Sequence, residues 1–271
     1  MGMAFRSAVS LALACTLAIG IWFSVPAFAQ TQSKTPETGK AKGQTLDAAT
    51  ILNRIDDLYR GESSHSMMTM TVKTRNWERS LSMEAWSQGK EKSLVKVLKP
   101  LKERGTATLK MGKEIYNYLP KTDRTIKLTA AMMGGSWMGS HFTNDDLVKE
   151  SRMADDFTSS ITFAGTRDGQ EAIEITGVPR PDAVVVWGKV VVLVRAKDYQ
   201  PLYVDYFDED GQMTRRMSFS DFQTTGGRLL PRKMRLIPTD KPDESTEVVY
   251  EDISFDVPLA DGFFSLNQLR R

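Results

Sequence analysis

The sequence predicts a mainly β protein with a few helices. We expect a curved antiparallel sheet of about eleven strands that forms an unclosed β-barrel, covered by an N-terminal helix and a lid segment. Three observations predict this class. Short segments of alternating polar and apolar residues recur from Ser66 to Phe255, turn residues separate them, and no long helices alternate with them. The missing βαβ alternation argues against doubly wound and α/β-barrel folds.

The composition is that of an ordinary globular protein. The 271 residues are 41% hydrophobic and 26% charged. With 36 Lys and Arg against 34 Asp and Glu, the net charge is only +2, so no global field favours nucleic acid. We therefore expect no nucleic-acid partner, and we expect a monomer. Cys15 is the single cysteine, which excludes an intramolecular disulfide.

Residues 1–29 predict a secretory signal peptide. Arg6 supplies the positive charge, Ala8 to Phe23 is the apolar run, and Ala27-Phe28-Ala29 is a cleavage site cut after its last residue. A lipoprotein acylation site at Cys15 is the alternative, which the apolar run continuing past this residue disfavours. The mature chain then contains no cysteine, as suits an oxidising compartment, and we expect it in the periplasm.

Residues 30–45 are polar and predict a flexible leader, and residues 46–271 predict a single domain. The domain begins with a predicted helix from Thr45 to Arg60, for which Asp47 is the expected N-cap and Gly61 the expected stop. Its apolar residues fall on one stripe: Ile51, Leu52, Ile55, Leu58 and Tyr59.

The strand pattern begins directly after this helix. Met68, Met70 and Val72 alternate with polar residues, and so do Leu81, Met83 and Ala85. Further along, Asp168-Gly169, Asp210-Gly211 and Gly226-Gly227 are turn signals of β-hairpins. We expect one face of each strand to be apolar and the other polar.

The segment from Thr129 to Asp156, here called the lid segment, interrupts the strand pattern. Its first half is rich in Gly, Met and Trp, and its second half predicts a short helix with Thr143 or Asn144 as N-cap. We expect this segment and the N-terminal helix to be too small to fill the inside of the sheet, which predicts a hydrophobic ligand cavity. We expect eight residues to line the cavity or its lid: Met68, Met70, Met83, Met132, Met133, Trp137, Met138 and Phe142.

The sequence offers little for catalysis or metal binding. Gly134 to Gly139 contains a serine but lacks the glycine that a nucleophile elbow needs two residues after it. We expect His141 to lie at the surface or to cap the helix, and we expect no catalytic residues, metal or cofactor. The basic run Lys96, Lys99, Lys102 and Arg104 could meet lipid headgroups, but we interpret it as a solvated edge.

The run from Met138 to Leu147 resembles the signature of the outer-membrane lipoprotein-sorting (LolA-like) family. The residues that carry the signature are Gly139, Ser140, Thr143, Asn144, Asp145, Asp146 and Leu147. The helix from Asp47 to Tyr59 and the strand from Lys113 to Pro120 are also similar to those of the family.

This resemblance implies an unclosed β-barrel with helices plugging its mouth, which binds the acyl chains of lipoproteins or other lipids. Such a protein carries its cargo through the periplasm towards the outer membrane, between an inner-membrane lipid exporter and an outer-membrane acceptor. Arg75 and Arg79 are candidates for the arginine that such carriers place inside the cavity, and His141 stands where an acidic residue is expected. Two alternatives are an accessory subunit of an inner-membrane lipid exporter and, less favoured, a secreted hydrolase.

Overall fold

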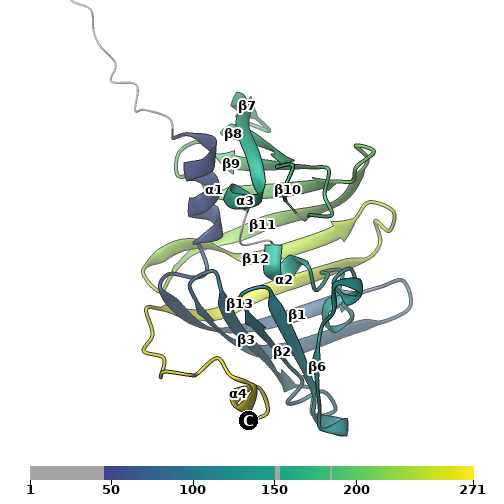
Figure 1. Ribbon diagram of the computed structural model, residues 1–271. Helices are drawn as coiled ribbons and strands as arrows, with labels where there is room; N and C mark the ends of the chain where they lie inside the picture. The colour runs from purple at the N-terminus through teal and green to yellow at the C-terminus, as the bar shows by residue number, and fades with distance from the viewer. Residues whose placement is uncertain (1–45, 150–152, 184) are drawn as a thin grey trace, which may run out of the picture. The chain divides into compact units, whose positions relative to one another are not determined.

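The computed structural model describes residues 46–149, 153–183 and 185–271 (Figure 1). The predicted signal peptide at 1–29 and the predicted leader at 30–45 lie outside these residues. The chain from Gln44 to Arg271 forms one compact unit. In the described ranges, no helix has the length and apolar character needed to cross a membrane.

One antiparallel sheet makes up most of this unit (Figure 1). Its strands are β1 (Ser63–Lys73), β2 (Glu78–Gln88), β3 (Lys92–Lys99), β4 (Ala107–Met111), β5 (Glu114–Leu119), β6 (Arg124–Lys127), β7 (Phe157–Arg167), β8 (Gln170–Pro179), β9 (Lys189–Arg195), β10 (Pro201–Phe207), β11 (Met213–Thr225), β12 (Arg228–Pro238) and β13 (Ser245–Phe255). The order across the sheet is β6-β5-β4-β3-β2-β1-β13-β12-β11-β10-β9-β8-β7. The strands β6 and β7 are the two edges, so the barrel is not closed, as predicted.

The sheet has thirteen strands, where the sequence predicts about eleven. The strand β6 is only four residues long, too short to show an alternating pattern. The hairpin signals are confirmed at Asp168-Gly169, between β7 and β8, and at Gly226-Gly227, between β11 and β12. Both residues of each turn have positive φ, 52° and 78° in the first and 57° and 77° in the second, as two-residue hairpins require.

The predicted N-terminal helix is confirmed but is shorter than expected. Helix α1 runs from Ala48 to Asp56, and the side chain of Asp47 accepts a hydrogen bond from the backbone N–H of Thr50, as an N-cap does. The stripe residues Ile51 and Leu52 are completely buried. The residues after Asp57 continue as turns rather than as helix up to Gly61, whose φ is +59°.

The main hydrophobic core lies on the inner face of the curved sheet, under α1. The alternating residues Met68, Met70 and Val72 of β1 and Leu81, Met83 and Ala85 of β2 are all buried in it. The register places Met68 opposite Met83 and Met70 opposite Leu81, so the two strands present their apolar residues on the same face.

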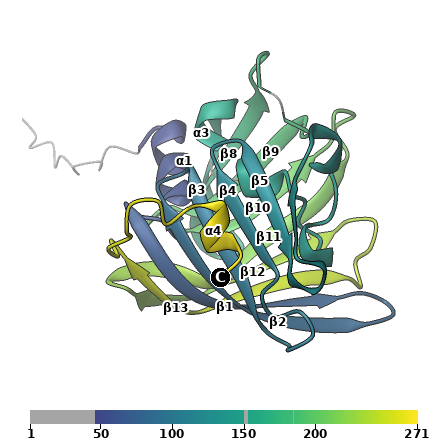
Figure 2. The ribbon, with the colours of Figure 1, turned by 60° about the horizontal axis from the view of Figure 1, so that its bottom comes forward.

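A second, smaller core lies on the outer face of β3 and β4. The C-terminal helix α4 (Leu266–Leu269) packs against β4 there (Figure 2). Its buried members are Leu94, Ala107, Leu109, Phe264 and Leu269. The expectation that the outer face is polar is therefore wrong for these strands, because the C-terminal segment covers them.

Replacing Met70 by Ala tests the position of the main core. The Met70 side chain is fully buried, so its truncation leaves a cavity and lowers the free energy of unfolding by about 2–5 kcal/mol. The exposed Lys73 on the same strand is the control, and its replacement by Ala changes this free energy by less than about 0.5 kcal/mol. If urea titrations gave the same loss of unfolding free energy for both variants, the placement of Met70 in the core would be contradicted.

Candidate functional site

In the described part of the lid segment, residues 129–149 and 153–156, the helices are short, and two of them lie in the first half, where the sequence predicts none. They are η2 (Ala130–Met132), η3 (Trp137–Gly139), α2 (Asp146–Lys149) and α3 (Met153–Asp156). The backbone N–H of Asp146 donates to the hydroxyl of Thr143, and the Asp146 carboxylate accepts from the backbone N–H of Thr143. These reciprocal bonds are those of a capping box, so Thr143 is the N-terminal cap.

The other polar residues of the signature fold the lid segment on itself. The side-chain amide of the buried Asn144 donates to the carbonyls of Met132 and Gly135, both at 3.1 Å. The Ser140 hydroxyl accepts from the backbone N–H of Phe142 at 3.1 Å. The residue types of this signature thus have a structural reason, which is to hold a loop that has no strand partners of its own.

Arg79 of β2 attaches this loop to the sheet. Its guanidinium donates to the carbonyl of Met138 and forms an ion pair with Glu103. A Cβ atom at residue 139 would lie 3.1 Å from Nη2 of Arg79, and φ is +70° there, so glycine is needed for this approach. Arg79 is therefore a lid contact, and Arg75, the other candidate for a cavity arginine, is exposed.

His141 attaches the loop to the start of β13. Its backbone N–H and its Nδ1 both lie within hydrogen-bond distance of the Thr246 hydroxyl, at 3.0 and 2.8 Å. Its Nε2 lies 3.1 Å from the Glu244 carboxylate. All three bonds form together if Nε2 carries the proton and the Thr246 hydroxyl donates to Nδ1. The expected surface or capping role of His141 is thus wrong, because this ring joins two elements.

The strongest attachment is a buried ion pair. Arg215 of β11 donates to both carboxylate oxygens of Asp146, at 2.8 and 2.5 Å, and the two side chains are 7% and 6% exposed. The guanidinium also lies over the rings of Trp187 and Tyr206, at 4.4 Å from each centroid. Sequence reasoning missed Arg215, although it occurs in phase with the apolar Met217 and Phe219 and so had to point inward.

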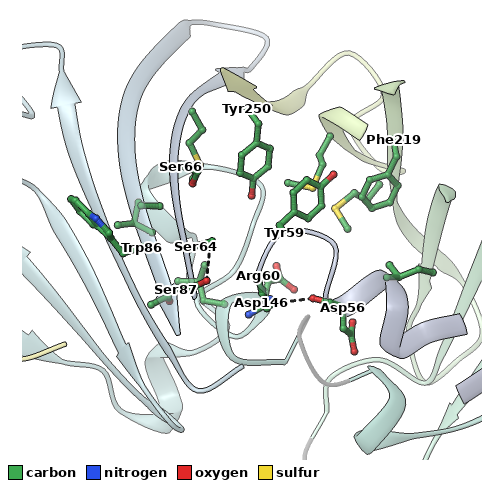
Figure 3. A pocket seen from close by; sticks show the side chains of 18 of the residues that line it. Asp56, Tyr59, Arg60, Ser64, Ser66, Trp86, Ser87, Asp146, Phe219 and Tyr250 are labelled. Carbon is green, nitrogen blue, oxygen red and sulfur yellow. Dashed lines mark hydrogen bonds between the residues drawn. The ribbon is translucent and has the colours of Figure 1, made fainter. Parts of the chain in front are cut away.

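A cavity of about 200 Å³ lies between α1, the lid segment and the inner face of the sheet (Figure 3). Its apolar wall includes Met68, Met153, Val204, Met217, Phe219 and Met234, and its polar wall includes Asp56, Arg60, Ser64, Ser66, Ser87 and Ser93. Figure 3 shows Ser64 and Ser87, whose hydroxyls are 2.7 Å apart, on one side and Tyr59 and Phe219 on the other. The cavity therefore has one apolar and one polar wall, as a site for an amphiphilic ligand would.

The predicted site residues occupy three environments. Met68 lines the cavity, together with Asp146 and Leu147 of the signature. Met70 and Met83 are fully buried in the core. Within the lid segment, Trp137 and Phe142 are buried and anchor it to the core, Met138 packs against that core, Met133 is half-buried and Met132 is 41% exposed. A ligand-binding role for these residues stays a prediction.

The sequence did not indicate the far wall of the cavity. Tyr59 follows α1, and Met217, Phe219, Met234 and Tyr250 come from the C-terminal half of the sheet. The Tyr59 and Tyr250 rings stack with their centroids 4.7 Å apart. The four strand residues look like ordinary inward positions. Tyr250 is the direct neighbour of Met68 across the β1–β13 pair, and only the curvature of the sheet brings Met217 and Phe219 of β11 opposite Met68.

The unclosed antiparallel barrel, the N-terminal helix and the anchored lid segment define a LolA-like fold. Three solved structures support this class. They are a DUF1329 family protein from Desulfovibrio piger (TM-score 0.74, 19% identity, covering 82% of this chain and 97% of that one), an outer membrane lipoprotein-sorting protein domain from Vibrio parahaemolyticus (0.72, 22%, 82% and 98%) and a LolA superfamily protein from Nitrosomonas europaea (0.70, 19%, 82% and 99%).

The sequence itself identifies a family. A family model described as "Uncharacterized protein" matches residues 89–271, which is more than half of the chain, and the chain belongs to that family. The comparison with curated proteins gives no match. The resemblance to LolA-like proteins is therefore confirmed at the level of the fold.

Replacing Arg215 by Met tests whether the buried ion pair holds the lid segment. The change leaves the Asp146 carboxylate buried without its cation, so the free energy of unfolding falls by about 3–5 kcal/mol and amide hydrogens of residues 132–147 exchange faster. A second replacement, Asp146→Asn, restores most of the loss because both charges are then absent, while the amide oxygen can still accept from the backbone N–H of Thr143. The exposed Arg235 of β12 is the control; a loss no larger than that of Arg235→Met would refute the role.

The contact between His141 and Glu244 predicts a pH dependence. The hydrogen bond from His141 lowers the pKa of Glu244 below its ordinary value of 4.5. A carboxylate whose pKa is lowered by folding stabilises the fold at pH values above its pKa in the unfolded chain. It loses this effect as the pH falls through its pKa in the folded protein. The drop in melting temperature between about pH 5 and about pH 3 should therefore be smaller in His141→Ala than in the unaltered protein. An unchanged drop would show that the contact does not form.

Proposed function

We propose that the protein is a periplasmic carrier that binds an acyl chain of a lipoprotein or another lipid and moves it towards the outer membrane. The observation that carries this proposal is the cavity, which methionine and aromatic side chains line beneath an anchored lid. Each CH₂ group moved from water into such a cavity contributes about 0.8 kcal/mol. Unbranched methionines adapt to chains of different shape, which suits a carrier that must also release its cargo.

The size of the cavity indicates how much cargo fits while the lid segment is in place. A volume of about 200 Å³ exceeds the roughly 150 Å³ that holds a benzene molecule, but it is below the roughly 300–1,000 Å³ of typical ligand pockets. One end of a chain fits into this space. A complete lipid requires α1 or the lid segment to move, and polar contacts such as Arg215–Asp146 can break and re-form during such a motion.

The polar wall of the cavity favours a cargo with a headgroup. The Arg60 guanidinium uses its Nε to donate to the carbonyl of Asp56, at 3.1 Å. Its remaining N–H groups, with the hydroxyls of Ser66 and Ser93, can donate to the headgroup of an amphiphile whose chain lies against Met217 and Phe219.

The alternative of a secreted hydrolase gains no support from the described residues. A serine nucleophile needs a general base within hydrogen-bond reach, and histidine is the most common one. His141 contacts β13, and His65 bonds to Glu84 and stacks on Trp86, while neither histidine lines the cavity that contains the serines. A role beside an inner-membrane lipid exporter is compatible with the same cavity and differs from the carrier only in its partner.

Extraction of the protein purified from its native periplasm tests this proposal. Organic extraction followed by mass spectrometry should recover lipid from the unaltered protein. Ala85 lines the cavity, so Ala85→Phe fills part of it and should reduce the recovered lipid several-fold. Val178→Phe, on the outside of β8, is the matched control and should retain the lipid.

Circular dichroism would first show that both variants fold. Lipid recovery no higher than from an unrelated periplasmic protein prepared in parallel would contradict the proposal, and so would equal recovery from both variants.

A further inference from the structure

Two neighbouring turns form a projecting end of the sheet. They are the loop 100–105, between β3 and β4, and the turn 120–123, between β5 and β6. They lie against each other, since a Cβ atom at Gly105 would be 3.5 Å from the Pro120 side chain. We call seven exposed basic and apolar residues of these turns and their flanks the basic tip: Lys99, Leu101, Lys102, Arg104, Leu119, Lys121 and Arg124.

Leu101 is an apolar residue that lies almost entirely in solvent. It is 82% exposed, more than any other large hydrophobic residue of the described chain, and Leu119 is 40% exposed. Backbone hydrogen bonds fix the loop that carries Leu101: Glu103 N–H donates to Pro100 at 2.9 Å, and Gly105 N–H donates to Val97 at 2.9 Å. The side chain is thus held away from the protein by an ordered loop.

The charges around this leucine are almost all positive. The five Lys and Arg residues of the basic tip form no ion pair with any residue described in the structure. Of the two acidic residues in the same turns, Glu103 pairs with Arg79, and the exposed Asp123 accepts a hydrogen bond from the Tyr118 hydroxyl and keeps its charge, so the five cations face one carboxylate without an ion pair to a described residue. A chain with a net charge of only +2 therefore presents a local cluster of unpaired cations here.

We propose that the basic tip docks on an anionic phospholipid bilayer, with Leu101 entering the interface between headgroups and acyl chains. Each Lys or Arg near an anionic bilayer surface strengthens the attraction, so five of them together supply useful affinity. Apolar side chains among cations are typical of interfacial membrane binding. A projecting side chain without a surrounding apolar patch suits a bilayer better than a protein surface, which requires a larger complementary area.

Lys99, Lys102 and Arg104 of the basic run are exposed, as expected for a solvated edge, and belong to the basic tip. Lys96 does not belong to it, because its ammonium donates to the carbonyl of Gln268 at 2.8 Å beside α4. The inference does not depend on the proposed cargo, since the basic tip lies outside the cavity. Its test therefore uses vesicles and needs no bound lipid.

The test is co-sedimentation of the chain without its predicted signal peptide with two kinds of vesicle. One kind is pure phosphatidylcholine and the other contains phosphatidylglycerol as well. The protein should sediment with the anionic vesicles only, and added salt should weaken this binding because it screens exposed charges. Lys102→Glu with Arg104→Glu should reduce the partition coefficient about tenfold or more, and Leu101→Ala should reduce it several-fold.

The matched control is Lys197→Glu with Lys241→Glu, which makes the same change in net charge at two exposed turns outside the basic tip. It should bind like the unaltered protein. An equal loss of binding in this control, or equal binding of the unaltered protein to both kinds of vesicle, would overturn the proposal. So would no sedimentation with anionic vesicles, which is the result expected if the basic tip binds an acidic protein instead.

Discussion

A sheet of thirteen strands that curves without closing leaves a large apolar inner face, and covering this face is the constraint on which the rest of the structure depends. The described chain covers it with α1 and the short helices of the lid segment, α3 among them. These elements cover the face without filling the space beneath them, because a cavity remains between them and the sheet. The hollow is thus a consequence of the ratio of strands to covering helices.

The lid segment is held by polar contacts rather than by extended apolar packing alone. Arg215–Asp146, His141–Glu244 and Arg79 with the carbonyl of Met138 fix it to three different strands or strand ends. Each of these contacts forms only in a particular geometry, so together they hold the lid segment in one position on the sheet. Its apolar anchors, Trp137 and Phe142, reach the core from that position. Such a cover can be displaced without disrupting the hydrogen bonds of the sheet.

Local patterns in the sequence were sufficient to predict the fold class, α1, the hairpins at Asp168-Gly169 and Gly226-Gly227, and the inward faces of β1 and β2. Each depends on residues that are close in the chain. The walls of the cavity could be predicted only in part, because the positions of Met217 and Phe219 opposite Met68 follow from sheet curvature. Arg215 was missed for the same reason: its partner Asp146 is 69 residues away. The outer core was hidden because α4 has only four residues.

The central claim is that the space between β1 and β11 receives an acyl chain. The most direct measurement is a crystal structure of the protein grown with a fatty acid that carries bromine at the end of its chain. The claim predicts anomalous bromine density inside the cavity, between Met68 and Phe219, with the carboxylate towards Arg60. An empty cavity, or bromine density only on the outer surface, would contradict it.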